Sequence, residues 1–202
     1  MERNKKLAKQ VAEAALRILE EEGPENVSMR RIARELGITP MAIYYYYPDR
    51  QALLKSVTDA EFGKLLRFFE IRQRQTPRNQ RLLMIMDGYL DYAFARPRVF
   101  DYVFSKNREG ARQFPDGFRN RQSPTLNPIA DAIAEGMQTG ELKQDDVWEV
   151  AMELWAHAHG YVALYHAGRF NLTERQFRML VRRSIRRLLD GLKTWGDSAQ
   201  VS

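Results

Sequence analysis

The chain has 202 residues, of which 44% are hydrophobic, and it carries 32 Lys and Arg against 26 Asp and Glu. A chain of this length can bury one large core or two small ones, so we expect one or two domains. The absence of Cys excludes disulfide frameworks, zinc fingers and thiol nucleophiles, and no window is apolar over the roughly 18 residues of a membrane span, so we expect a soluble cytoplasmic protein without a membrane partner.

The net charge of +6 suits a nucleic-acid partner, but its distribution along the chain does not locate a binding site. Residues 1–50 hold 9 basic and 8 acidic side chains, residues 51–125 hold 14 and 8, and residues 126–202 hold 9 and 10. Most of the excess therefore lies in the middle of the chain. Positive charge lowers the repulsion from phosphate, but a motif has to identify the site.

Apolar residues recur at helical spacing along almost the whole chain, and no stretch alternates as a strand does. The pattern predicts an all-α fold with an N-terminal three-helix domain over residues 1–48 and a C-terminal helical bundle over residues 49–202. Residues 107–124 are expected to form a loop. About nine helices are expected, near residues 4–22, 29–36, 40–46, 49–74, 78–95, 97–105, 125–138, 145–167 and 173–194.

Residues 27–50 predict two short helices joined by a turn of a few residues, which is the pattern of a helix-turn-helix. Ser28 suits the N-cap of the first helix, and Gly37 suits the left-handed position that ends it. Thr39 suits the N-cap of the second helix. Pro40 falls in the first turn of that helix, where a missing N–H costs nothing.

The second helix is expected to display tyrosines away from its core. At 100° per residue, Ile43 and Tyr47 share the inward side, so Tyr45 points outward. A helix fits the major groove, where a Tyr hydroxyl donates to phosphate and its ring packs on sugars or base edges. The alternative is a surface cluster or packing against the first helix. The predicted DNA contacts are Ser28, Arg30, Thr39, Pro40, Met41, Ala42, Tyr44, Tyr45, Tyr46 and Arg50, with Arg50 and the helix start at Asp49 facing backbone phosphates.

With these residues, the segment from Gly23 to Val57 resembles the DNA-binding domain of the tetracycline-repressor (TetR) family of bacterial regulators. The sequence departs from the family pattern in having Arg50 where Lys is usual and Tyr46 where His is frequent. The resemblance covers about residues 5–60. The matching positions are Ser28, Ile32, Ala33, Gly37, Ile38, Tyr44, Tyr47, Arg50 and Leu53.

The resemblance implies a homodimeric repressor that binds a near-palindromic operator in double-stranded DNA and is released by a small-molecule effector in its C-terminal domain. It also implies dimerisation through the last two long helices, near residues 145–167 and 173–194. Both segments have broad apolar faces, which suit an isologous four-helix contact or packing within one subunit. The run from Trp155 to Tyr161 resembles the Trp-His-Gly signature of one C-terminal subgroup.

We predict no metal and no cofactor. His157 and His159 point about 200° apart on a helix, and His166 lies roughly 10 Å along the helix from His159, so neither pair can hold one ion. A buried, hydrogen-bonded His is expected instead. The aromatic and Met residues of the middle helices are either plain core or an effector pocket. The candidates for such a pocket are Met84, Met86, Tyr89, Tyr92, Phe100, Phe104, Trp155, His159 and Tyr161.

Two other classes of function compete with a regulator. An enzyme is disfavoured because no nucleophile–base constellation is visible and the three His residues lie within ten positions. An all-α protein-interaction module without DNA binding is the alternative in which the exposed tyrosines contact a protein. A last basic strip suits a solvated helix face or an anion site and comprises Arg178, Arg182, Arg183, Arg186 and Arg187.

Overall fold

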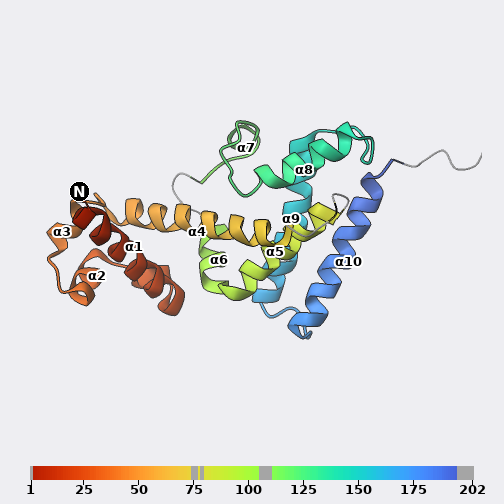
Figure 1. Cartoon of the computed structure of the whole chain (residues 1–202). Coiled ribbons are helices and arrows are strands. Elements are labelled where there is room, and N and C mark those ends of the chain that lie inside the picture. Colours follow the sequence, from red (N-terminus) through yellow and green to blue (C-terminus); the bar gives the residue numbers. More distant parts are fainter. Residues whose placement is uncertain (1, 74–76, 78–79, 105–110, 195–202) are drawn as a thin grey trace, which may run out of the picture. The chain divides into compact units, whose positions relative to one another are not determined.

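The computed structural model describes residues 2–73, 77, 80–104 and 111–194, and these ranges hold ten α-helices, one short 3-10 helix and no strand (Figure 1). The predicted all-α class is confirmed. The elements are α1 (Glu2–Glu22), η1 (Pro24–Asn26), α2 (Met29–Leu36), α3 (Pro40–Tyr44), α4 (Arg50–Gln73), α5 (Arg81–Ala95), α6 (Pro97–Phe104), α7 (Asp116–Arg119), α8 (Asn127–Gln138), α9 (Val147–His166) and α10 (Glu174–Leu192).

Each of the nine predicted helices is present, with small changes at the ends. The helix predicted over residues 40–46 ends at Tyr44, because Tyr46 N donates to Ile43 O at 2.9 Å and the chain tightens into a turn before Pro48. The ends predicted at residues 74 and 105 and the start predicted at residue 78 lie outside the described residues, and α5 begins at Arg81.

The loop predicted over residues 107–124 was wrong at Asp116–Arg119, where the chain forms the single turn of α7. Residues 107–110 lie outside the described part of the chain. Phe118 in this turn is buried, and its ring centroid lies 6.4 Å from that of Trp155. A tertiary contact thus stabilises a turn that local composition does not predict.

The chain forms two compact units, residues 1–64 with 92–111 and residues 65–91 with 112–202. The chain passes from the first unit to the second within α4 and returns to the first within α5, so each unit is made of two separate segments. The predicted domain boundary between residues 48 and 49 follows chain order and stays a prediction.

The core of the first unit is built from the inward faces of α1 to α4 together with α6. On α2, Ile32 and Ala33 are buried, and Ile43 of α3 packs beside them. Val99 and Val103 bring α6 into the same hydrophobic cluster. The helix-turn-helix is therefore packed on the same core as α6, which follows it by some fifty residues.

The second unit packs α8, α9 and α10 with parts of α4 and α5. Gly88 of α5 lies so close to α4 that an added Cβ would sit 3.1 Å from the Phe68 carbonyl carbon, which favours Gly there. At the start of α9, the Asp146 carboxylate accepts from Trp148 N and Glu149 N. Within the described residues, no helix has the length and apolar composition needed to cross a membrane.

Candidate nucleic-acid interface

The two short helices of the helix-turn-helix are fixed by the caps that the sequence predicts. Ser28 Oγ accepts from Arg31 N at 3.3 Å, and Thr39 Oγ1 accepts from Ala42 N at 3.4 Å. Gly37 adopts φ 65° and ψ 34°, the left-handed conformation in which glycine has no steric penalty. Both helix starts and the turn between them are therefore defined locally.

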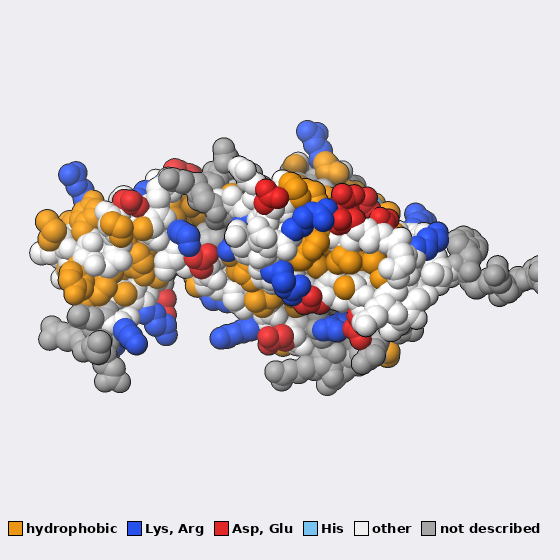
Figure 2. All heavy atoms as spheres, turned by 90° about the horizontal axis from the view of Figure 1, so that it is seen from above, with side chains coloured by type: hydrophobic (Ala, Val, Ile, Leu, Met, Phe, Trp, Pro, Cys, Tyr) orange, Lys and Arg blue, Asp and Glu red, His pale blue; other side chains and the backbone are white. Residues whose placement is uncertain are grey.

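Among the described residues of the first unit, the most exposed large apolar side chains lie on the outward side of α3 and at the residue that follows it. Met41 and Tyr45 are each 75% exposed, and Tyr44 is 45% exposed. The Tyr46 ring packs edge-on against Tyr45, with the two centroids 5.0 Å apart. We call Met41, Tyr44 and Tyr45 the recognition surface. Figure 2 shows hydrophobic side chains gathered over this end of the first unit.

The remaining predicted contacts surround the recognition surface with different degrees of exposure. Ser28, Arg30, Thr39 and Pro40 are exposed, whereas Ala42 is half-buried. Ser28 and Thr39 use their hydroxyl oxygens as cap acceptors. Each can still donate its hydroxyl hydrogen to another group. The set therefore offers a cation, hydroxyl donors and apolar surface around one short helix.

Tyr47 and Arg50 anchor the end of the motif to the rest of the unit. Tyr47 is half-buried, and its hydroxyl donates to Ala8 O at 3.1 Å, as expected for the inward side of α3. The half-buried Arg50 side chain donates from Nε to Val27 O at 2.8 Å and from Nη2 to Pro24 O. The guanidinium thus connects the start of α4 to the segment before α2. These two hydrogen bonds use donors that the predicted phosphate contact would also need.

An ion-pair network that sequence reasoning missed joins α2 to α1. Arg31 binds the Glu22 carboxylate through two donors and the Glu35 carboxylate through Nε at 3.2 Å. Glu35 also contacts Arg17 at 2.5 Å. Hydrogen bonding lowers the pKa of Glu22 and raises that of Arg31. Only the four-residue spacing of Arg31 and Glu35 was visible in the sequence.

The effector-pocket candidates fall into separate groups. Tyr92, Phe100 and Phe104 form a chain of ring contacts in the first unit, with centroids 6.4 Å and 5.0 Å apart. In the second unit, Met86 is buried and Met84 is half-buried. No candidate is among the residues that line a cavity of about 220 Å³ between Arg81, Leu142 and Leu189.

Three of the candidates share a polar contact inside the second unit. The Tyr89 hydroxyl accepts from Trp155 Nε1 at 3.2 Å and lies 2.9 Å from His159 Nδ1. Burial raises the pKa of Tyr89 well above its usual range. Tyr161 belongs to another cluster, where its hydroxyl donates to Ser184 Oγ at 3.2 Å and its ring stacks on Phe170.

Two of the three histidines of α9, His157 and His159, are hydrogen-bonded within the second unit. His157 Nε2 lies 2.8 Å from Ser184 Oγ, and both His157 and His159 are half-buried. Among the described residues, no group of three or more His, Cys, Asp or Glu side chains is placed to hold a metal ion. His157 and His159 are thus hydrogen-bonded, as expected, but half-buried rather than buried.

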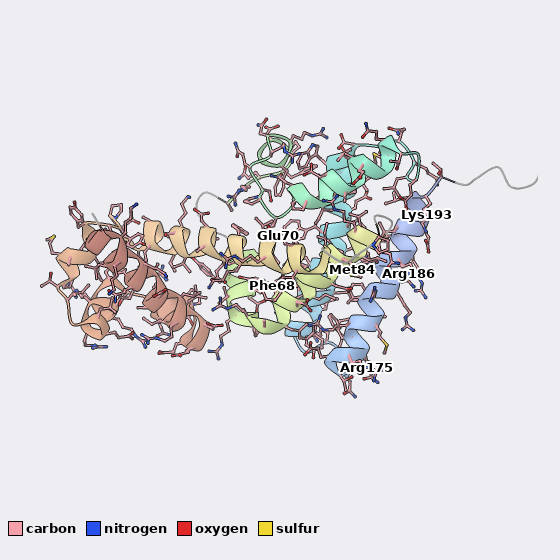
Figure 3. The ribbon with its side chains drawn as sticks, viewed as in Figure 1. Phe68, Glu70, Met84, Arg175, Arg186 and Lys193 are labelled. Carbon is pink, nitrogen blue, oxygen red and sulfur yellow. The ribbon has the colours of Figure 1, made fainter. Side chains whose placement is uncertain are left out.

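The basic strip of α10 is divided between paired and exposed side chains. Arg178 binds Asp91 and Glu174, each at 2.8 Å, and Arg182 lies 3.6 Å from Asp87. Arg183, Arg186 and Arg187 are exposed. Figure 3 shows Arg175, Arg186 and Lys193 along α10, from its first turn to just past its end.

Two family models match most of the chain. Residues 11–57 match the model described as bacterial regulatory proteins, tetR family. Residues 82–188 match the tetracyclin repressor-like C-terminal domain, which covers more than half of the chain.

Curated relatives match over shorter stretches. The chain is 47% identical over 49 residues to the HTH-type transcriptional repressor DrrR1 of Streptomyces coeruleorubidus, which covers 24% of this chain and 18% of that protein. It is 20% identical over 137 residues to the fatty acid metabolism regulator protein of Bacillus subtilis (strain 168), which covers 67% of this chain and 70% of that protein.

Solved structures share the fold over nearly the whole chain. A protein with unknown function from Rhodococcus sp. RHA1 matches with a TM-score of 0.78 and 20% identity, covering 93% of this chain and 96% of that chain. The transcriptional regulator FadR from Bacillus subtilis in complex with stearoyl-CoA matches with a TM-score of 0.71 and 17% identity, covering 91% and 98%. At these identities the likeness concerns the fold.

Proposed function

The chain belongs to the tetracycline-repressor family of bacterial regulatory proteins, and we propose on this basis that it is a transcriptional repressor that binds a near-palindromic operator as a homodimer and leaves it when a small-molecule effector binds. One observation carries the DNA-binding part. Met41, in the first turn of α3, and Tyr45, directly after its last residue, stand exposed on one side of a short helix that is capped at its start and anchored on its other side.

The recognition surface would enter the major groove, with Tyr45 and Met41 against base edges. Phosphate contacts would come from the hydroxyl of Tyr44 and from two exposed side chains around the recognition surface, Arg30 and Thr39. Arg50 keeps its predicted phosphate role only if its guanidinium serves both the phosphate and the carbonyls of Pro24 and Val27.

Selection of bound sequences from random duplex DNA tests this function. We expect two copies of one short sequence in inverted orientation, at a spacing of about one helical turn or a multiple of it, because a two-fold dimer presents two equal recognition surfaces. Recovery of no preferred sequence, together with binding that does not weaken as salt rises, would refute DNA binding and favour a protein-interaction module.

We propose that α9 and α10 supply the dimer contact. Ala156, Gly160 and Leu164 lie four residues apart on one face of α9, and Leu164 is 50% exposed. An added Cβ at Gly160 would meet open space, so a partner helix can approach closely there. Leu188 of α10 is also exposed. These features support an isologous four-helix contact rather than packing within one subunit alone.

For the effector we propose an amphipathic molecule with a long apolar portion. The support is the fold shared with the stearoyl-CoA complex of Bacillus subtilis FadR and the aromatic character of the second unit. The polar group formed by Tyr89, Trp155 and His159 would recognise a hydrogen-bonding group of the effector. Stearoyl-CoA is the first probe. Release of operator DNA by stearoyl-CoA would support the proposal, and unchanged DNA binding at saturating concentration would exclude this compound.

The remaining assignments follow from the same family membership. We propose that the protein acts in the cytoplasm, is not an enzyme, and belongs to the subgroup with the Trp-His-Gly signature around Trp155–Gly160. The residues of that signature make the hydrogen bonds of the second unit described above, so their conservation in such a subgroup would have a structural reason.

A further inference from the structure

A buried carboxylate lies in the middle of α4, outside the recognition surface. Glu61 is 0% exposed. Its carboxylate accepts from Arg96 Nη1 at 3.0 and 3.2 Å and from the Tyr92 hydroxyl at 2.9 Å, and it lies 2.6 Å from Lys64 Nζ. All four residues belong to the first unit. The charge of Glu61 is therefore paired and hydrogen-bonded, as burial requires.

Arg96 binds a second carboxylate at the same time. Its Nε and Nη2 donate to the two oxygens of Glu20 at 3.0 and 2.8 Å, so one guanidinium at the corner between α5 and α6 joins α1 to α4. Arg98 donates to the carbonyls of Glu20 and Glu21 in the last turn of α1. The hydrogen bond from Arg96 lowers the pKa of Glu20 and raises that of Arg96.

Stability alone does not explain this ion network. Removing charges from water is costly, and a buried ion group replaced by well-packed apolar side chains of similar volume often leaves stability unchanged or raises it. Contacts between apolar side chains are not directional. The hydrogen bonds of a guanidinium are directional, so Arg96, bound to two carboxylates, fixes the positions of Glu20 and Glu61 relative to each other. The network therefore suits a positioning role.

The two helices held by Arg96 are also those on which the helix-turn-helix rests. Along α1, Ala8 O accepts from Tyr47, and Arg17 pairs with Glu35 of α2. At the start of α4, Arg50 is bonded to Val27 O. A change in the register between α1 and α4 would therefore shift the supports of α2 and α3.

We propose that Arg96 is a positioning residue for DNA binding: by clamping Glu20 of α1 and Glu61 of α4, it keeps the helix-turn-helix in one DNA-competent arrangement. This inference rests on the proposed DNA-binding function. Loss of the clamp would leave only a fraction of molecules competent, and the apparent Kd would rise by the inverse of that fraction while the contacts in the complex stay the same.

The test compares the wild-type chain with the triple variant Glu61→Met, Tyr92→Phe, Arg96→Met. The charges that lose a partner in it are those of Glu20 and Lys64, whose side chains are 38% and 42% exposed, and no fully buried charge or hydroxyl is left without its partner. We expect the unfolding midpoint to fall by no more than it does in Glu20→Gln, which loses the same Glu20–Arg96 pair. We expect operator affinity to be lower on the order of tenfold, with an unchanged slope of log affinity against log salt. A merely structural role would change affinity only in step with stability.

A matched control is Arg121→Met, which removes an ion pair with Asp131 at 2.9 Å in the second unit and should leave affinity unchanged. If the triple variant folds and binds as tightly as the wild type, the positioning role is wrong. If it does not fold, Arg96→Lys decides, since Lys cannot bind both carboxylates bidentately. Wild-type affinity of Arg96→Lys would then overturn the inference. A wild-type chain that selects no DNA sequence refutes the proposed function instead.

Discussion

Tyr45 is the side chain on which sequence preference is expected to depend most. Its ring is 75% exposed and touches Tyr46 edge-on, so little of its surface is used within the unit. Removing the ring should therefore change the DNA complex more than the free protein.

We predict that Tyr45→Ala weakens operator binding by about 1–3 kcal/mol and alters the selected half-site, with little change in the unfolding midpoint. Repeating the selection from random DNA measures both effects. Ile71→Ala, which trims another exposed apolar side chain outside the recognition surface, is the control. Identical half-sites for Tyr45→Ala and the wild type would contradict a base contact.

Arg50 has two candidate roles that one variant separates. Because two of its donors are bonded to backbone carbonyls, Arg50→Ala should lower the free energy of unfolding by about 1–3 kcal/mol. We expect the salt dependence of DNA binding to stay the same. A salt slope smaller by about one unit would instead establish the phosphate contact. Denaturant unfolding and salt titration of operator binding provide the two measurements.

At the scale of elements, the turn between α2 and α3 depends on one backbone conformation. Gly37 has φ 65°, and an added Cβ there would meet open space, so any cost of a side chain comes from the backbone. Gly63, inside α4, has equal space and no positive φ. The two glycines form a matched pair.

Gly37→Ala should destabilise the protein by roughly 1–2 kcal/mol, whereas Gly63→Ala should stabilise it by about 0.5–1 kcal/mol through helix propensity. Denaturant melts of the two variants measure this difference. Equal shifts in the two variants would mean that the turn does not require the left-handed conformation.

At the scale of the whole molecule, acid should destabilise the fold by protonating a few hydrogen-bonded carboxylates. The pKa of Glu20 is lowered by hydrogen bonding to Arg96, and that of Asp146 is lowered by the backbone N–H of Glu149 and by Arg119. A carboxyl whose folded pKa lies below its unfolded pKa stabilises the fold above the unfolded value. That contribution is lost as the pH falls through the folded value.

The unfolding midpoint should therefore change little with pH from about 6 to 5 on account of these groups and fall below about pH 4. Thermal melts across this range measure the fall. Glu20→Gln should lower the midpoint at neutral pH and flatten its acid dependence, because the substituted side chain has no proton to gain. An unchanged acid dependence in Glu20→Gln would show that the Glu20–Arg96 pair contributes nothing.

Dimerisation is the other property of the whole molecule. Gly160→Arg adds a long side chain where the protomer has open space, so the fold should persist while a partner helix is kept away. We expect monomers by light scattering and loss of binding to a two-half-site operator. Gly63→Arg, also in open space but outside the proposed interface, should remain dimeric. A dimeric Gly160→Arg would exclude this face of α9.

The sequence determined every described α-helix except α7, together with the caps and the recognition surface, because their signals are local. Ser28, Gly37 and Thr39 act on groups within a few residues, and the outward position of Tyr45 follows from its distance to Ile43 and Tyr47. Family resemblance from the same segment implied a regulator, which the matching family models support.

The tertiary structure alone decided how distant residues combine. Glu20, Glu61 and Arg96 are separated by 41 and 35 positions, so no periodic pattern relates them until α1, α4 and the corner after α5 are packed together. The same holds for the hydrogen bonds that Arg50, a predicted phosphate contact, donates to the Val27 and Pro24 carbonyls. Short-range sequence patterns fix the conformation of a segment, whereas burial and long-range pairing fix which polar groups it has to satisfy.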